Sequence, residues 1–436
     1  MHKSISWSLT MLAAASFASG SLRAASAQTG ATLTGQDAFT DYSKEAPGIR
    51  RHITAADLPK PFATESSNNG PHVVAKPADA WPKAPAGFKV DLYAQGDFKV
   101  NRLIRFAPNG DLFLADSGDN SIIVLRGVGA DGKVQQRETF ATGLNQPFGI
   151  NFYPAQNPKW VYVGNTDSVV RFPYKAGDMK ASGPAETIVE KIPTGGGHIT
   201  RDIAFSPDGK RMFVSVGSAS NVDDVDTHPS EFHRADVLEY TPEGKFVKVY
   251  ASGIRNCVGE TINPTTGQLW CSTNERDGLG DNLVPDYVTS VKEDGFYGWP
   301  FYYIGNHPDP RHNGKHPELA SKVIAPDVLL QPHFASLELT FYPTQGGQFP
   351  AGFQGDGFAA EHGSWNKSKR AGYEVVRIPM KNGHATGEFE DFLTGFVTAD
   401  GQVWGRPVGV AVAKDGSLFV SDDGSKSVWH VTYTGK

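Results

Sequence analysis

The sequence predicts an all-β protein, a six-bladed β-propeller with an extended N-terminal tail. Three observations lead to this fold class. A motif of strand, Asx/Gly turn and strand recurs six times along the chain, as expected for propeller blades. The 48 glycines and 29 prolines favour many turns and few long helices. Aromatic residues make up 11% of the chain, which suits a strand-rich core.

The N-terminus has the pattern of a signal peptide. Lys3 supplies a positive start, an apolar run spans residues 9–17, and Ala25–Ala27 fits a small-residue cleavage site. The apolar run is too short to cross a bilayer, and no later window is apolar enough for a membrane helix. We therefore expect a signal peptide at residues 1–27, cleaved near Ala27, and a periplasmic or secreted protein. A buried N-terminal helix is the alternative.

The next segment, residues 28–80, is polar, contains Pro, Ser and Asn, and shows no sustained period. We predict an extended N-terminal tail that wraps over the surface. A single propeller domain is expected to follow at residues 81–436. That length is large for one domain, but all-β domains exceed the usual size.

The repeat predicts an antiparallel hairpin with alternating apolar positions. Its copies are FAPNGDLFLAD (106–116), FYPAQNPKWVYVGN (152–165), FSPDGKRMFVSVG (205–217), INPTTGQLWCSTN (262–274), FYPTQGG to GDGFAAEHG (341–363) and VAKDGSLFVSDD (412–423). One sheet cannot bury both of its faces alone, whereas a closed ring buries them between neighbours and protects the strand edges. A β-sandwich with chance similarity between the repeats is the alternative.

Two further segments have a place in this ring. GFKVDLYAQG (87–96) is a candidate strand that joins SVWHVTYTG (427–435) and closes it. The aromatic segment 294–312 is predicted to be an insertion that walls a pocket.

The charge and the cysteine count narrow the function classes. The formal net charge is −6, which disfavours nucleic acid or an anionic membrane as a partner. The chain has two cysteines, Cys257 and Cys271, and no CxxCH motif, which argues against covalent haem. The hairpin turn between them places Glu260 opposite Cys271, so a disulfide requires an irregular strand. Both states, bridged and free, remain open.

A histidine on a glycine loop is the first candidate for chemistry. His198 ends the run Gly195–His198, directly before the third repeat. The glycines let the backbone approach a ligand closely. A neutral imidazole there can accept a proton from a substrate hydroxyl. The plain alternative is a histidine with no catalytic role.

Three cations occupy equivalent loop positions. Arg255, followed by Asn256, precedes the fourth hairpin; Lys367 follows the fifth repeat; Arg406 precedes the last. Loop arginines at a channel mouth suit bidentate carboxylates or phosphates. Each alone is explained as simply by a salt bridge between blades. Together, in an acidic protein, they indicate a polyanionic ligand.

The loop NERDGLGDN (274–282) has the composition of a calcium loop, with acids, amides and glycine. It lacks the EF-hand spacing, and a hydrogen-bonded turn is the alternative. The chain has no HExxH, GxSxG or Walker pattern.

From residue 87 to the C-terminus the chain resembles the glucose/sorbosone dehydrogenases, soluble quinoproteins that use pyrroloquinoline quinone. The resemblance rests on the order of these segments: GFKVDLYAQG, GGGH with IAFSPDG, IRN before NPTTGQLW, NERD, FYGWP, HGSWNKS and GRPVGVAVAKDGSLFVSDD. The family fold is a six-bladed propeller, in agreement with the repeat count.

The resemblance implies a mechanism. The family's loop histidine is its general base and corresponds here to His198, which would take the proton of a substrate hydroxyl while hydride passes to the quinone. A calcium ion polarises the quinone carbonyl as a Lewis acid. In the family, main-chain carbonyls after an acidic residue hold this ion, which corresponds to Asp277 and Gly278.

The cofactor carries three carboxylates and needs a cationic cradle. The family's Arg–Asn pair corresponds to Arg255 and Asn256, its cofactor lysine to Lys367 and its late arginine to Arg406. Gln146, in GLNQPFGINF, lies near the family's substrate-side glutamine and completes the expected set.

Two departures from the glucose-oxidising pattern bear on the substrate. The histidine loop reads HITRD, with Arg201 three residues on, and the metal loop has Arg-Asp-Gly where Gly-Pro is usual. Both are more similar to the sorbosone branch, whose members oxidise an aldehyde or aldose. We therefore expect a pyrroloquinoline quinone- and calcium-dependent dehydrogenase that acts on a small sugar or sugar aldehyde and passes electrons to an unidentified acceptor.

Two other functions suit the same fold. A calcium-dependent propeller lactonase or hydrolase would line its channel with carboxylates and asparagines, whereas the loops here offer His, Arg and Lys. A non-catalytic binding propeller would not need His198 and Arg255 to converge.

Overall fold

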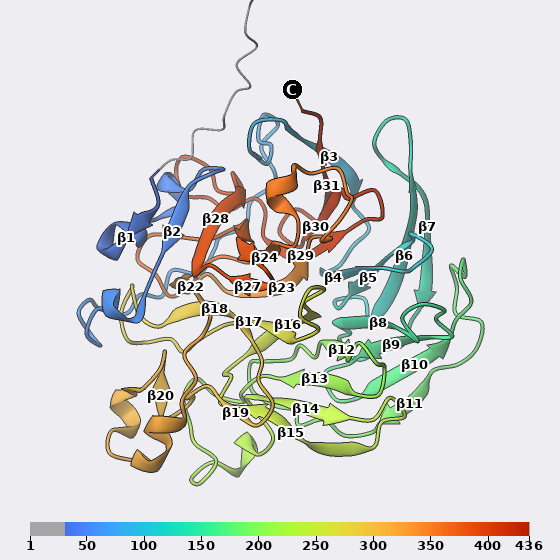
Figure 1. Ribbon diagram of the computed structural model, residues 1–436. Helices are drawn as coiled ribbons and strands as arrows, with labels where there is room; N and C mark the ends of the chain where they lie inside the picture. Colours follow the sequence, from blue (N-terminus) through green and yellow to red (C-terminus); the bar gives the residue numbers. More distant parts are fainter. Residues whose placement is uncertain (1–30, 436) are drawn as a thin grey trace, which may run out of the picture.

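Each predicted hairpin forms the first two strands of a blade, and the six blades form a ring (Figure 1). This computed structural model describes residues 31–435, so the expected signal peptide lies outside the described residues. The first strands of neighbouring blades contact one another all the way round the axis. The predicted all-β, six-bladed propeller is confirmed.

The first three blades follow one another in sequence. The first contains β4 (Asn101–Phe106), β5 (Leu112–Asp116), β6 (Ser121–Val128) and β7 (Val134–Ala141). The second contains β8 (Gly149–Tyr153), β9 (Trp160–Gly164), β10 (Val169–Pro173) and β11 (Glu186–Val189). The third contains β12 (Ile203–Phe205), β13 (Met212–Val216), β14 (Asp236–Tyr240) and β15 (Phe246–Ser252), with the short helix η4 (Pro229–Glu231) before β14.

The last three blades have the same antiparallel order. The fourth contains β16 (Cys257–Ile262), β17 (Leu269–Thr273), β18 (Pro285–Ser290) and β22 (Val328–Pro332). The fifth contains β23 (Ser336–Phe341), β24 (Gly357–Glu361), β25 (Glu374–Ile378) and β28 (Glu388–Leu393), with η7 (Ala351–Phe353) and the hairpin β26 (Met380–Lys381) and β27 (His384–Ala385) between strands. The sixth contains β29 (Pro407–Val412), β30 (Leu418–Asp422), β31 (Ser427–Tyr433) and β3 (Phe88–Gln95).

The ring closes between its two ends, as predicted. Strand β3 pairs antiparallel with β31, from Phe88 opposite Tyr433 to Gln95 opposite Ser427. The N-terminal strand therefore completes the last blade, and no blade edge is left open at the junction.

Both faces of each blade are buried against a neighbour. All five residues of β5 are buried, and Phe113 packs edge to face on Phe152 of the second blade with ring centroids 5.0 Å apart. Second strands are therefore buried along almost their whole length, without the exposed alternate positions of a one-sided sheet.

Carboxylates on the axis bond the inner strand edges. Glu338 accepts hydrogen bonds from the amides of Ile104 (3.2 Å) and Val410 (3.1 Å), and Asp202 accepts one from the Glu260 amide (2.8 Å). Arg105 lies between the two carboxylates, 3.4 Å from Asp202 and 3.1 Å from Glu338. Amides that have no strand partner are thus satisfied where the blades meet.

The insertion between β18 and β22 extends beyond the predicted segment. It contains β19 (Gly295–Phe296), β20 (Tyr302–Tyr303), β21 (His307–Pro308), η5 (Pro310–His312) and η6 (Pro317–Lys322). Its first strand pairs in parallel with β15 of the third blade.

The N-terminal segment lies against the fifth blade. It contains β1 (Leu33–Thr34), η1 (Gly35–Ala38), η2 (Tyr42–Lys44), β2 (Arg50–His52) and η3 (Ala55–Asp57). Strand β2 pairs antiparallel with β28, and the buried Arg51 side chain forms an ion pair with Asp391. The outer edge of this blade is therefore covered by the chain's own N-terminal segment.

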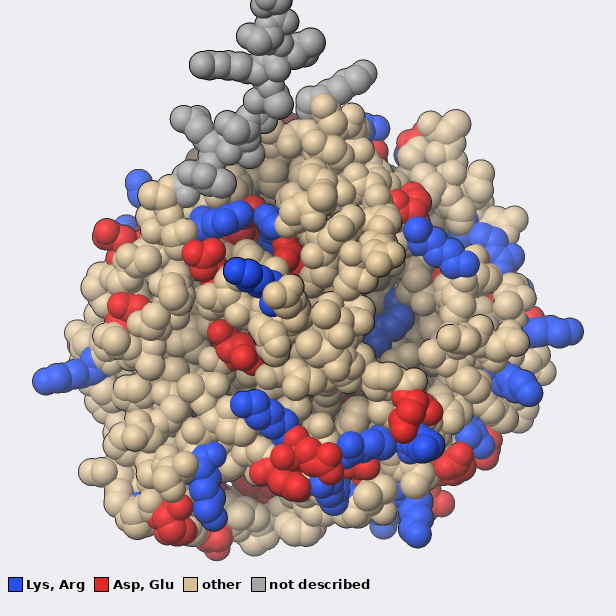
Figure 2. Space-filling model, viewed as in Figure 1, with Lys and Arg blue, Asp and Glu red and all other residues tan. Residues whose placement is uncertain are grey.

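Charges are mixed on the surface. Figure 2 shows Lys and Arg interspersed with Asp and Glu over one face, with no continuous basic surface there. Among residues 31–435, no helix is both long and apolar enough to cross a membrane.

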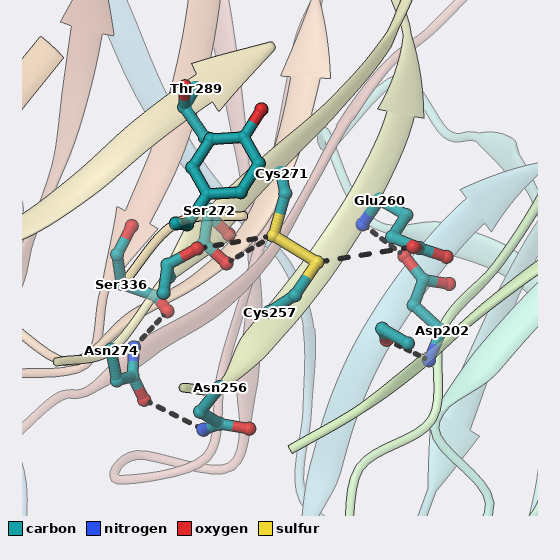
Figure 3. The surroundings of a disulfide bond; sticks show 12 residues. Asp202, Asn256, Cys257, Glu260, Cys271, Ser272, Asn274, Thr289 and Ser336 are labelled. Carbon is teal, nitrogen blue, oxygen red and sulfur yellow. Dashed lines mark hydrogen bonds between the residues drawn. A yellow bond between two sulfur atoms is a disulfide. The ribbon is translucent and has the colours of Figure 1, made fainter. Parts of the chain in front are cut away.

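A disulfide joins Cys257 and Cys271 (Figure 3). Glu260 pairs with Cys271, as the turn predicts, and Cys257 pairs with Thr273. A shift of register between Cys257 and Gly259 supplies the required irregularity, and the two Cα atoms lie 5.7 Å apart. The bridge therefore links the first two strands of the fourth blade.

Candidate active site

A cavity of about 620 Å³ collects side chains from all six blades. Its wall includes Arg102, Gln146, His198, Arg255, His362 and Arg406. The structure thus brings together His198, Gln146, Arg255, Asn256, Asp277 and Arg406, six of the residues predicted from sequence. Gly278 and Lys367 do not line it.

His198 has its proton position fixed by the backbone. Its Nδ1 lies 2.8 Å from the carbonyl oxygen of Ser218, which can only accept, so Nδ1 carries the hydrogen. The described residues offer Nε2 no hydrogen-bond partner. Burial lowers the pKa of His198 well below its usual value, and the positive charge of Arg255 adds to this. A neutral imidazole with a free lone pair therefore faces the cavity.

The glycine loop allows this close packing. Gly196 has φ +74°, and a Cβ there would lie 1.8 Å from the Ala219 carbonyl oxygen. A Cβ on Gly217 would lie 2.1 Å from Asn256 Oδ1 and 2.8 Å from the Cβ of His198. The third and fourth blades therefore approach at the histidine as closely as glycine permits.

Two buried arginines hold the histidine loop. Arg234 donates to the carbonyl oxygens of His198 (3.2 Å) and Ser218 (2.9 Å), and Arg201 donates to the His198 carbonyl (3.1 Å). Burial lowers the pKa of Arg201 to about 9, helped by Arg234. Sequence reasoning noted Arg201 as a departure but missed Arg234, because its partners are main-chain oxygens distant in sequence.

Arg255 is held by several acceptors. It donates to the Asn221 carbonyl (3.0 Å), the Asn221 side chain (3.1 Å) and the Glu275 carbonyl (2.7 Å), and lies 3.6 Å from Asp277. It lines the cavity, yet it also joins the third and fourth blades. Asn256 donates to Asn274 (3.3 Å), and its buried Oδ1 has no partner among the described residues.

Arg406 offers free donors. Its Nε donates to the carbonyl oxygen of His362 (3.1 Å), and its two terminal nitrogens have no partner among the described residues. Loss of water lowers its pKa and outweighs the opposing effect of Asp423. A partly buried guanidinium with unpaired donors in a cavity wall is suited to an anionic ligand.

Arg406 belongs to a network that sequence reasoning missed. Asp423 accepts from His362 Nε2 (2.8 Å) and from Arg102 (2.8 Å). Burial and then Arg406 lower the pKa of His362 to about 4, against the effect of Asp423. Arg102 lies within β4, where its sequence gives no signal. His362 stands in the HGSWNKS segment, where the sequence predicts the lysine as the ligand.

Lys367 is buried beside the cavity wall without lining it. Its Nζ donates to Asn282 Oδ1 (3.0 Å), and burial lowers its pKa to about 8. Trp365, two residues earlier, lines the wall and is 45% exposed. The loop predicted from sequence does reach the cavity, but the residue that lines the wall is Trp365 and not Lys367. Gln146 lines the wall from a left-handed position, φ +46°.

Asp277, in the predicted metal loop, is engaged in other contacts. Asp277 lies 3.1 Å from His333 and 3.6 Å from Arg255, and its carbonyl accepts from Asn221 (2.9 Å). The Gly278 amide donates to Asn366 (3.2 Å). Calcium takes six to eight oxygen ligands, whereas residues 31–435 contain no group of three or more His, Cys, Asp or Glu placed to hold a metal. Side chains alone therefore provide no metal site in this loop.

Comparisons with known proteins agree with the fold. A family model described as TrAA12-like matches residues 82–294 and 307–434, and its gap falls in the insertion after β18. An uncharacterized protein of Borreliella burgdorferi is 27% identical over 362 residues, covering 80% of this chain and 90% of that protein. The pyrroloquinoline quinone-dependent pyranose dehydrogenase of Coprinopsis cinerea is 24% identical over 386 residues, covering 72% of this chain and 51% of its own length. The match thus spans about half of that enzyme.

Solved structures show the same fold at low identity. An iodide structure of the Trichoderma reesei enzyme of carbohydrate-active family AA12 superposes with a TM-score of 0.70 at 19% identity, covering 84% of this chain and 100% of that one. The holo quinone domain of the Coprinopsis cinerea pyranose dehydrogenase gives 0.68 at 21% identity, covering 82% and 98%. The apo aldose sugar dehydrogenase of Escherichia coli gives 0.59 at 16%, covering 79% and 99%.

Proposed function

Because the chain belongs to the TrAA12-like family, we propose that it is a sugar dehydrogenase that uses pyrroloquinoline quinone as its cofactor. The observation that carries this is His198 in the cavity. Its Nδ1–H donates to the Ser218 carbonyl, so Nε2 keeps a lone pair for a substrate proton. Names of relatives, a pyranose dehydrogenase and an aldose sugar dehydrogenase, support the substrate class.

The cavity suits a cofactor with several carboxylates. Its volume of about 620 Å³ lies in the range of small-molecule sites. The terminal nitrogens of Arg406 are free to bind one carboxylate. Arg102, which donates to Asp423, adds a second positive charge to the same cavity wall. The unpartnered Oδ1 of Asn256 and the aromatic face of Trp365 complete the polar and stacking contacts available. Arg255 contributes positive charge, although its donors are engaged.

When bound, the quinone supplies the acceptor for hydride from the sugar carbon. The chain's own part is proton transfer and orientation. Nε2 of His198 takes the hydroxyl proton as the C–H bond breaks, and a C=O bond forms on the same carbon. For an aldehyde, its hydrate or cyclic hemiacetal provides the hydroxyl. A positioned base of this kind accelerates the reaction by about 10²–10⁴-fold.

Three finer points belong to the proposal. The substrate is an aldose or sugar aldehyde of the sorbosone type, supported by the HITRD loop. The protein acts in the periplasm or outside the cell after loss of residues 1–27, supported by the disulfide, which persists in oxidising compartments. Calcium dependence rests on the family resemblance alone, since the side chains of residues 31–435 form no group placed to hold a metal.

The test uses the full chain purified without cofactor. Pyrroloquinoline quinone is added with an artificial electron acceptor and a panel of aldoses and sugar aldehydes, with and without Ca²⁺. We expect sugar oxidation that requires the quinone. Absence of quinone binding would refute the proposal, and lactone hydrolysis with calcium alone would indicate a hydrolase.

A further inference from the structure

An N-terminal segment outside the family match contacts two loops of the cavity wall. This segment, residues 62–69, is called the strap below. The family model begins at residue 82, so the strap is an addition to the shared propeller. The loops come from different blades: residues 277–282 connect β17 to β18, and residues 365–370 connect β24 to β25.

The strap bonds the first loop through its hydroxyl groups. Thr64 Oγ1 accepts from the Asp281 amide (2.8 Å), and Ser66 Oγ accepts from the Gly280 amide (3.1 Å). The Phe62 amide donates to the Leu279 carbonyl (2.9 Å). Gly280 has φ +112°, and a Cβ there would lie 2.9 Å from the Thr64 carbonyl oxygen. Strap and loop are therefore in direct contact.

The strap bonds the second loop through Asn69. Its amide donates to the Trp365 carbonyl (2.7 Å), and its side chain donates to the Ser368 carbonyl (3.0 Å). Asn366 joins all three segments, because its side chain donates to the Ser67 carbonyl (2.5 Å) and accepts from the Gly278 amide (3.2 Å). The two loops are thus cross-linked through the strap.

This junction carries two residues of the cavity wall. Asp277 precedes the bonded amides, and Trp365 bears the carbonyl that Asn69 binds. Trp365 is 45% exposed, so side-chain packing alone holds it weakly. No strand ladder connects the two loops among the described residues. The loops also bond each other directly, since Lys367 donates to Asn282 (3.0 Å) and the Ser368 amide donates to Asp281 (2.9 Å). The strap adds bonds to both loops and so reinforces their relative position.

We propose that Thr64, Ser66 and Asn69 are positioning residues of the cofactor cavity, which hold the Asp277 and Trp365 loops at a fixed separation. As far as it concerns the cofactor, the inference rests on the proposed function. The loop-fixing part stands independently and is measured without any ligand.

The first experiment measures amide hydrogen exchange in the cofactor-free full chain. Thr64→Val and Ser66→Ala remove the acceptor hydroxyls, whereas Thr64→Ser keeps one. We expect exchange at Gly280 and Asp281 to rise about tenfold in the combined Thr64→Val/Ser66→Ala variant and to stay near wild type in Thr64→Ser. Unchanged exchange in the combined variant would overturn the proposal.

The second experiment measures quinone affinity by calorimetry. The combined variant should raise the Kd for pyrroloquinoline quinone about tenfold, and Thr64→Ser less than about twofold. Thr54→Val is the control, because Thr54 bonds Asp57 within the same N-terminal segment. Equal affinity in the combined variant and wild type would overturn the positioning role. Failure of wild type to bind quinone would instead refute the proposed function, with the exchange result still deciding on the strap.

Melting temperatures accompany both measurements. Where the combined variant does not fold, Thr64→Val and Ser66→Ala are read singly, each at the amide it bonds. A single variant counts against the proposal if it folds and changes neither the hydrogen exchange at the amide it bonds nor the quinone affinity.

Discussion

The Nδ1 atom of His198 lies 2.8 Å from the carbonyl oxygen of Ser218. This contact determines which ring nitrogen carries the proton, because a carbonyl cannot donate. Nε2 is left free at the cavity, and the pKa is lowered by burial and nearby arginines. The histidine is therefore deprotonated over a wide pH range and is suited to act as a base.

The pH profile of activity should report the charges around His198. Three arginines lower its pKa, namely Arg255, Arg234 and Arg201. We expect the acidic limb of kcat/KM below pH 6.5, the ordinary value for histidine. Arg234→Met removes one positive charge, so the His198 pKa should rise and the limb should move to higher pH. An unshifted limb in an active, folded variant would contradict this electrostatic role.

Arg406 should bind the cofactor more than it stabilises the fold. Its terminal nitrogens have no protein partner in the described chain, so Arg406→Ala removes ligand contacts and few internal ones. We expect a 10–100-fold increase in the quinone Kd by calorimetry, about 1.4–2.8 kcal/mol. Arg171→Ala is the control, because Arg171 pairs with Glu186 away from the cavity wall. Strong destabilisation with unchanged affinity would indicate a structural salt bridge instead.

Acid should destabilise the protein through His362. Its folded pKa of about 4 is below the unfolded value, so the unfolded chain binds the proton more readily. The contribution of neutral His362 to the free energy of unfolding is therefore fully present above pH 6.5 and is lost as the pH decreases toward 4. Between pH 7 and pH 5 we expect a loss of about 2 kcal/mol in denaturant unfolding. His362→Gln should flatten that dependence, and an equally steep loss in the variant would assign it to other groups.

The disulfide should stabilise the fourth blade. It closes a short loop, with a sequence separation of 14. Replacing both cysteines with serine should lower the free energy of unfolding by about 3 kcal/mol, since the unfolded chain regains the entropy of that loop. Denaturant unfolding of the double variant measures this. An unchanged midpoint would show that the bridge adds no stability.

The repeats predicted the fold because every copy occupies the same structural position, the hairpin between the first two strands of a blade. The closing pair of β3 and β31 followed from strand patterns at the two ends. The irregular strand required for a disulfide was recognised from the Glu260–Cys271 register, but whether it forms depends on a bulge that the residues do not specify.

The site was predictable where loops carry recognisable side chains, as for His198 and Arg406. It was not predictable where side-chain direction decides, as for Trp365 and Lys367 in one loop. Contacts with backbone acceptors could not be predicted from the sequence either, because a carbonyl such as that of Asn221, which holds Arg255, has no sequence signature. The same reason limits the metal loop, because carbonyl ligands leave little trace in residue identity.

The most direct test of the central claim is the absorbance of the bound quinone after an aldose is added without any electron acceptor. Wild-type protein and the His198→Gln variant are first loaded to equal occupancy with pyrroloquinoline quinone. The account predicts reduction of the quinone in wild type and a rate at least about 100-fold lower in the variant. No reduction in wild type by any sugar, or equal rates in both proteins, would contradict it.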